Sequence, residues 1–228
     1  MKIPTPIVET QELVDFLRDH LDKDVGFINR LKSIYRPYIC PFDDLLNLIP
    51  EHQHILDIGC GVGTLLQLVA QYRKPLSLAG LETTPSMIEG VCSWFNRYSP
   101  NILIRLEAYD GTNLPTWISD YEYVFLIDVL HHVPRARQTT FLEKLFHLLK
   151  PGAKLIIKDI DADEQFWCLF NKLHDMVVSR EISHEVAATQ LHSTLRQIGF
   201  ETDDIVKKRL HVYPHYTIAC QKPCGIQD

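Results

Sequence analysis

The feature that most constrains this chain is a short apolar segment that leads directly into three closely spaced glycines. Residues 55–58 read Ile-Leu-Asp-Ile, and residues 59–63 read Gly-Cys-Gly-Val-Gly. Glycine lets the backbone turn sharply and approach a ligand closely, and the N-terminus of a following helix offers free N–H groups to that ligand. The segment therefore predicts a buried strand, a ligand-binding turn and a helix in succession.

The residues after this turn alternate between strand and helix patterns. Apolar runs predict strands at 55–58, 76–81, 102–106, 123–127 and 154–160, and amphipathic segments between them predict helices, including one that starts at Thr84-Pro85. Near the C-terminus, a predicted helix over 183–198 ends at Gly199 and is followed by strands over 205–211 and 215–220. Because the connection between these two strands is short, they form an antiparallel hairpin. The order predicts an α/β fold, a doubly wound and mostly parallel sheet of seven strands.

The first fifty residues follow a different pattern. Residues 10–22 and 27–35 carry apolar side chains at helical spacing, Pro37 and Pro41 interrupt the pattern, and 42–49 resume it. Because no repeat or flexible linker divides the chain, we expect a single domain over 1–228. It consists of a helical cap over 1–50 and a core over 51–222 with an insertion at 161–183.

Charge and composition narrow the function classes. The 228 residues hold 23 Lys and Arg against 29 Asp and Glu, a net charge of −6 that argues against nucleic acid as a partner. The sequence contains neither an export signal nor an apolar run of the roughly 20 residues that would cross a membrane. The six cysteines form no C-x-x-C pair, so we expect reduced thiols, a cytoplasmic location and no metal site.

The spacing of acidic residues and glycines distinguishes between nucleotide cofactors. Glu82 ends the second predicted strand, 25 residues after Asp57, where a carboxylate can accept both hydroxyls of a ribose. The dinucleotide pattern G-x-G-x-x-G that starts at Gly59 needs glycine at position 64, which is Thr64. A nicotinamide cofactor is therefore disfavoured.

At this point the sequence resembles the S-adenosylmethionine-dependent methyltransferases of the Rossmann-like class. Five motifs match in order, at 55–63, at Glu82, at 110–115, at 121–133 and at 148–153. The resemblance implies that Asp57 binds the amino group of the methionine moiety, that Glu82 binds the ribose, and that Asp110 accepts the adenine amino group. The implied cofactor-binding residues are Asp57, Gly59, Cys60, Gly61, Gly63, Glu82, Thr83, Met87, Asp110, Gly111 and Ile127.

Candidates for the chemistry follow from the reaction. A sulfonium methyl group leaves by in-line displacement, so the protein mainly positions the acceptor, and a hydroxyl or ammonium acceptor also needs a base within about 3 Å. His131, directly after the fourth strand, and Tyr35 in the cap are the catalytic candidates. Tyr38, His132 and Trp167 are the candidates for substrate contact. The alternative for each is simple packing or solvation.

The expected function is methyl transfer to an oxygen or nitrogen of a small molecule. The Asn-Pro-Pro-Tyr type signature of adenine, cytosine and glutamine methylation is absent after the fourth strand, where residues 127–130 read Ile-Asp-Val-Leu. Aromatic residues in the cap and in the insertion suit a partly apolar pocket. Two alternatives remain open: a catalytically silent cofactor-binding subunit, and an RNA or protein methyltransferase. The sequence specifies neither the acceptor nor an oligomeric state.

Overall fold

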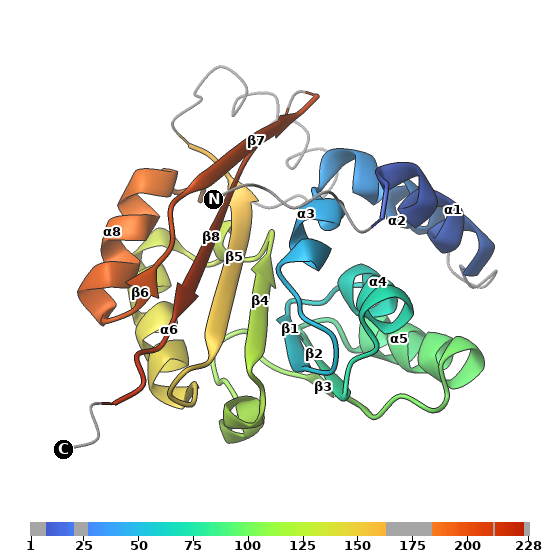
Figure 1. Cartoon of the computed structure of the whole chain (residues 1–228), viewed down its shortest axis with the longest axis horizontal. Helices are drawn as coiled ribbons and strands as arrows, with labels where there is room; N and C mark the ends of the chain where they lie inside the picture. The colour runs from blue at the N-terminus through green and yellow to red at the C-terminus, as the bar shows by residue number, and fades with distance from the viewer. Residues whose placement is uncertain (1–7, 21–26, 163–183, 212, 226–228) are drawn as a thin grey trace. The chain divides into compact units, whose positions relative to one another are not determined.

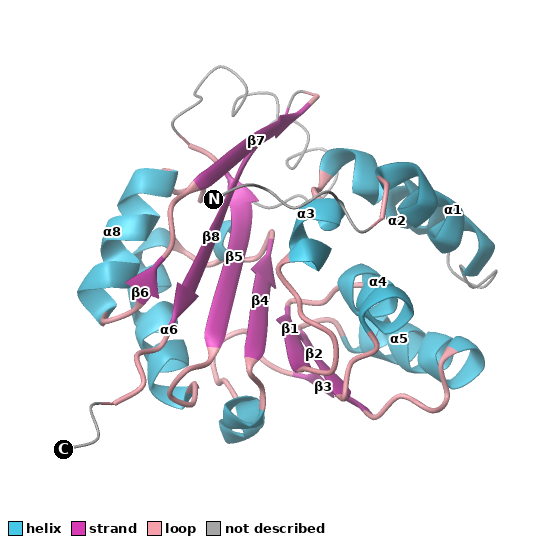
Figure 2. Ribbon diagram, viewed as in Figure 1, coloured by secondary structure: helices cyan, strands magenta, loops and turns pink. Residues whose placement is uncertain are grey.

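The computed structural model describes residues 8–20, 27–162, 184–211 and 213–225 (Figure 1). Its Cα atoms group into two compact units, Met1–Tyr109 and Asp110–Asp228, each of which contains part of the α/β architecture. Both units contain strands and helices (Figure 2).

The first unit is built on three parallel strands, β1 (His54–Ile58), β2 (Ser77–Glu82) and β3 (Ile104–Ala108). They lie in the order β3-β2-β1, and β1 aligns with β2 so that Asp57 is opposite Gly80. Helices α4 (Thr64–Arg73) and α5 (Pro85–Tyr98) follow β1 and β2. Both strands are almost wholly buried, as their apolar sequences predict.

The predicted cap forms three helices, α1 (Thr10–His20), α2 (Phe27–Ile39) and α3 (Phe42–Asn47). Helix α1 packs against α2 and α3, and α3 packs against α4. The expected break at Pro37 is wrong, since α2 continues through it to Ile39. Pro37 lies in the last turn, where the missing N–H removes a single hydrogen bond and few residues follow.

The second unit contains strands β4 (Tyr123–Ile127), β5 (Lys154–Ile160), β6 (Glu201–Thr202), β7 (Val206–Leu210) and β8 (Tyr213–Gln221). Strand β4 pairs with β5 in parallel, whereas β8 runs antiparallel to β5, β6 and β7. The β7–β8 hairpin matches the sequence prediction. The two-residue strand β6 was not predicted, and it raises the strands assigned among the described residues from the expected seven to eight.

The described residues of the second unit form helices α6 (Arg135–Leu148) and α8 (Ala188–Ile198) and the 3-10 turns η1 (Thr116–Asp120) and η2 (Leu130–His132). The predicted helix over 183–198 begins later, at Ala188, while its end at Gly199 is confirmed. Backbone groups of His184 bond elsewhere: its N–H donates to the His131 carbonyl at 2.8 Å, and its carbonyl accepts from Gln138 Nε2 at 2.9 Å. These bonds hold residue 184 outside the helix.

These elements confirm the predicted fold class, an α/β fold with mostly parallel strands, an antiparallel C-terminal hairpin and an N-terminal group of helices. Among the described residues, no helix is both long enough and apolar enough to cross a membrane.

Candidate functional site

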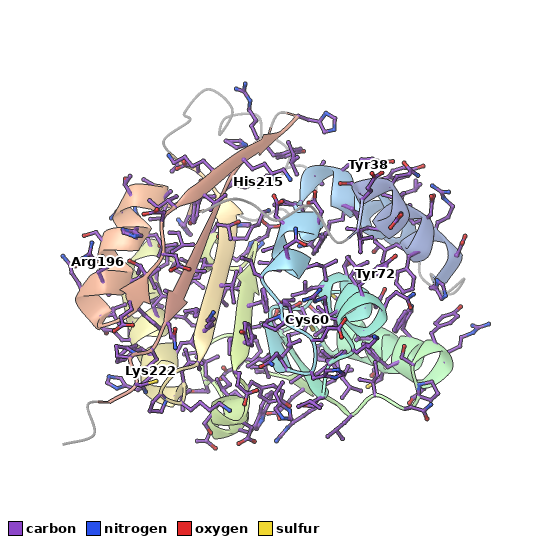
Figure 3. The ribbon with its side chains drawn as sticks, viewed as in Figure 1. Tyr38, Cys60, Tyr72, Arg196, His215 and Lys222 are labelled. Carbon is purple, nitrogen blue, oxygen red and sulfur yellow. The ribbon has the colours of Figure 1, made fainter. Side chains whose placement is uncertain are left out.

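The glycine turn after β1 has the backbone conformation that the sequence predicts. Gly59, Gly61 and Gly63 all have positive φ, at 76°, 54° and 77°. The N–H groups of Gly59 and Cys60 donate to the Leu81 carbonyl at 2.7 and 3.0 Å, which ties the turn to the end of β2. Cys60 lies in this turn in Figure 3, and its thiol is buried, which raises its pKa.

Gly63 is more tightly enclosed than Gly61. It occupies the left-handed region at the N-terminus of α4, and a Cβ built on it would lie 2.9 Å from both γ-methyl groups of Val91 in α5. Only glycine fits this conformation and this spacing without displacing α5. At Gly61, by contrast, a Cβ would meet nothing within 4 Å, so the turn is open on that side.

The carboxylate of Glu82 connects the glycine turn to the β2–α5 connection. Its Oε2 accepts from the Gly61 N–H at 2.9 Å, and its Oε1 accepts from the N–H groups of Thr83 and Thr84 at 2.8 and 3.1 Å. The Thr83 hydroxyl also donates to Oε1, at 3.1 Å. Oε2 accepts a single hydrogen bond among the described residues, and since a carboxylate oxygen can accept at least two, it retains acceptor capacity.

Asp57, at the end of β1, is a buried carboxylate with one unsatisfied oxygen. The residue is 3% exposed, and its Oδ1 has no hydrogen-bond partner among the described residues. Burial raises the pKa of the Asp57 carboxyl to about 7. The positive charge of Arg36 opposes this rise, and the negative charge of Glu82 adds to it. A buried acceptor without a donor is costly, so this position suits a ligand that brings an N–H group.

Arg36 is the residue of this site that the sequence analysis did not identify. It lies on α2, and its guanidinium carbon is 5.9 Å from the centre of the Phe42 ring on α3. Its charge acts on Asp57, which is far from it in sequence. A basic residue in an amphipathic helix is ordinary, so only the fold could pair it with Asp57.

The other predicted cofactor residues of the first unit lie next to these groups in sequence. Thr83 is exposed and Met87, on the first turns of α5, is half-buried. In the second unit, Ile127 is the buried last residue of β4 and Gly111 is half-buried. The Asp110 carboxylate accepts from the N–H groups of Thr112 and Asn113 and from the Asn113 side chain, at 2.8, 2.7 and 2.6 Å. These bonds lower its pKa.

The second unit places His131 in a buried pair with Asp159. His131 Nδ1 is 2.6 Å from Asp159 Oδ1, and the His131 N–H donates to Oδ2 at 3.1 Å. The Ile160 N–H donates to Oδ1 at 2.8 Å, which orients the carboxylate. The side chains of His131 and Asp159 are 7% and 3% exposed. A carboxylate beside Nδ1 favours the proton on Nδ1, so Nε2 is the basic nitrogen of this ring.

The remaining candidates fall in three places. His132 is exposed, with its ring centre 4.1 Å from that of His131. Tyr35 and Tyr38 stack on each other on α2, with ring centres 6.2 Å apart. Trp167 lies outside the described residues. Asp159 lies in the strand predicted over 154–160, and its partnership with His131 depends on the pairing of β4 with β5.

Comparisons with known proteins agree with this arrangement. A family model described as a methyltransferase domain matches residues 33–205, most of the chain. An O-methyltransferase of Penicillium expansum is 27% identical over 90% of this chain and 66% of its own length. Erythromycin 3''-O-methyltransferase of Saccharopolyspora erythraea is 33% identical over 49% of this chain and 36% of its own length. The chain thus spans less than two thirds of the length of each of these relatives.

Solved structures share the fold. Magnesium protoporphyrin IX methyltransferase of Synechocystis, with S-adenosylhomocysteine bound, aligns with a TM-score of 0.66 at 17% identity, over 91% of this chain and 93% of its own. A methyltransferase of Methanosarcina mazei aligns with a TM-score of 0.62 at 22% identity, over 78% and 96% of the two chains. With the family model covering most of the sequence, the chain belongs to the class I methyltransferases, a family that uses S-adenosylmethionine as its cofactor.

Proposed function

We propose that this protein transfers the methyl group of S-adenosylmethionine to a hydroxyl oxygen of a small molecule. The single observation that carries the proposal is the buried Asp57 oxygen that lacks a donor, beside the open turn at Gly61. Relatives named as O-methyltransferases support oxygen as the target atom. The acidic net charge of −6 supports a small acceptor over a nucleic acid.

The residues of the first unit match the polar groups of this cofactor. The methionine end carries an ammonium and a carboxylate, and the structure offers Asp57 and Arg36 as groups of opposite charge. Glu82 would accept hydrogen bonds from the ribose hydroxyls through Oε2. When bound, the cofactor supplies an electrophilic methyl group on a sulfonium. The task of the protein is then to orient the acceptor and exclude water.

The second unit supplies a base suited to a hydroxyl acceptor. With Nδ1 held by Asp159, His131 presents Nε2 as the atom that would take the hydroxyl proton, and the aspartate would stabilise the resulting imidazolium. In this proposal His131 is the catalytic base and Asp159 a positioning residue. A neutral amine acceptor would need no such base, so the pair supports a hydroxyl over a neutral amine, and the O-methyltransferase relatives support a hydroxyl over an ammonium group.

Calorimetry and a transfer assay test the proposal. S-adenosylhomocysteine should bind the purified protein, and absence of binding at millimolar concentration would overturn the cofactor assignment. His131→Asn should lower the rate of transfer from methyl-labelled cofactor to a panel of phenols by about 10²–10⁴-fold, the contribution typical of a general base. Affinity for S-adenosylhomocysteine should stay unchanged.

Matched variants complete the test. Asp159→Asn should lower the rate and shift its pH dependence, because the carboxylate sets the basicity of the ring. His147→Asn, an exposed histidine on α6, should behave as wild type. Cofactor binding without transfer to any phenol, amine, peptide or RNA would identify the chain as a silent cofactor-binding subunit.

A further inference from the structure

Lys158, on β5, is a charged side chain that the fold buries almost completely. Only 1% of its side chain is exposed, and its Nζ donates to Asp128 Oδ1 at 2.6 Å. The cost of taking both charges out of water offsets most of their attraction. Such a pair therefore contributes more to specifying one conformation than to stability.

The backbone of Asp128 has a conformation that needs support. Its φ is +55°, in the left-handed region that residues other than glycine rarely adopt. The other described residues with positive φ that are not glycine lie at exposed positions, whereas Asp128 is half-buried directly after β4. A strained residue persists only where its surroundings hold it, and strain of this kind clusters at functional sites.

Two adjacent residues of β5 hold the connection that follows β4, and Figure 1 shows these two strands side by side. Lys158 holds Asp128 twice, since its carbonyl also accepts from the Asp128 N–H at 2.9 Å. The next residue, Asp159, holds the N–H and the ring of His131. Because successive residues of a strand point to opposite faces of the sheet, the connection is held on both faces at the end of β5.

This arrangement fixes both ends of a short segment that carries the proposed base. Only two residues separate Asp128 from His131, and the left-handed φ of Asp128 sets the direction in which the chain leaves β4 for η2. A change of φ at Asp128 would redirect this segment and move the His131 ring relative to Asp159. A displacement of about 1 Å at a reacting group can cost a factor of about 100 in rate.

We propose that Lys158 and Asp128 form a clamp that positions His131 by holding the backbone of Asp128 in its left-handed conformation. We call these two residues the β5 clamp. The inference rests on the proposed function, since it concerns the base of that reaction. Lys158 and Asp128 are positioning residues, which act through His131.

Nitrogen NMR of the full chain with isotopically labelled histidine tests the clamp without any substrate. In wild type, Asp159 should keep the His131 proton on Nδ1, and His131→Asn identifies the signal by its loss. In a combined Lys158→Met and Asp128→Gly variant, the proton should move toward Nε2, the form that a neutral histidine prefers in water. This variant should fold, because it leaves neither charge of the pair unpaired and glycine accepts positive φ. Asp128→Gly alone should shift the signal in the same direction.

Methyl transfer from labelled cofactor to a panel of phenols provides a second measurement. The combined variant should transfer about 10-fold to 100-fold more slowly than wild type, with unchanged affinity for S-adenosylhomocysteine. Asp128→Asn should restore a rate within about threefold of wild type, because asparagine tolerates positive φ and its side-chain oxygen still accepts from Lys158. Lys150→Met is the matched control: the Lys150–Glu122 ion pair joins the residues just before the same two strands, and its loss should alter neither the rate nor the His131 signal.

The outcomes separate the two proposals. A wild-type His131 signal in the combined variant overturns the clamp, whatever the rate, and so does the absence of an Nδ1 proton from His131 in wild type. A changed signal with an unchanged rate supports the clamp and overturns the role of His131 as base. If wild type neither binds S-adenosylhomocysteine nor methylates any phenol, the proposed function fails, while the histidine spectra still decide whether Lys158 and Asp128 position the ring.

Discussion

Replacing Asp57 by asparagine should stabilise the protein in the absence of cofactor, and the gain should grow with pH. Burial raises the pKa of the Asp57 carboxyl from 3.8 to about 7. A carboxyl with a raised pKa holds its proton longer in the folded state than in the unfolded state. The free energy of unfolding therefore falls as pH rises from about 4 to about 7 and is level above that range. An amide at this position has no such dependence.

The magnitude follows from the two pKa values. With 1.36 kcal/mol for each pKa unit, the loss of unfolding free energy caused by the raised pKa of Asp57 is about 1.7 kcal/mol at pH 5 and about 4 kcal/mol at pH 8. The stability advantage of Asp57→Asn should thus grow by roughly 2–3 kcal/mol between these pH values, as an order of magnitude. The same change should weaken binding of S-adenosylhomocysteine, because an amide does not neutralise the ammonium group.

Urea unfolding at pH 5, 6, 7 and 8 measures the effect, with Asp120→Asn as the control at an exposed aspartate. The control should follow the wild-type curve at every pH. If Asp57→Asn also runs parallel to wild type, the Asp57 carboxylate is not a desolvated charge, and its assignment to the cofactor amino group loses its physical basis.

Two further substitutions test the site. Glu82→Gln replaces an acceptor oxygen by a donor facing the backbone N–H groups, and should weaken S-adenosylhomocysteine binding by about 1.5–3 kcal/mol in calorimetry; equal affinity in a folded variant would refute the role of Glu82. Gly63→Ala should lower the unfolding free energy by at least about 1–2 kcal/mol, since it places a Cβ in the left-handed region against Val91. Gly90→Ala, in the open middle of α5, should instead raise it by about 0.5–1 kcal/mol; a gain at both glycines would contradict the packing argument.

Features that depend on local sequence were predictable. The glycine turn, the acidic end of β2 and the helix start at Pro85 follow from residue types at fixed spacing, and the structure has them at the expected places. The end of α2 was not predictable in the same way. Pro37 predicts a break, yet its buried position in the last turn lets the helix continue.

Pairings between distant segments could not be predicted from residue spacing. Arg36 acts on Asp57 only because the fold of the first unit brings their charges within range of each other, and Asp159 orients His131 only because β5 lies beside β4. The late start of α8 has a similar cause. The sequence pattern predicts helix from residue 183, but the backbone of residue 184 forms hydrogen bonds with η2 and α6 instead. In each case a tertiary contact decides the local outcome.

The hydrogen bonds of Glu82 have a consequence for how the protein meets its cofactor. Four donors from the glycine turn and the β2–α5 connection converge on one side chain, so both segments hold their shape without a ligand. Binding then costs little conformational entropy, and we expect rapid, rigid association rather than a loop that folds around the nucleoside. The hydrogen bond from the Gly61 N–H to Glu82 also depends on the length of the glutamate side chain, which reaches from the end of β2 to the glycine turn. Aspartate, one methylene shorter, would keep the charge at position 82 and lose this preorganisation.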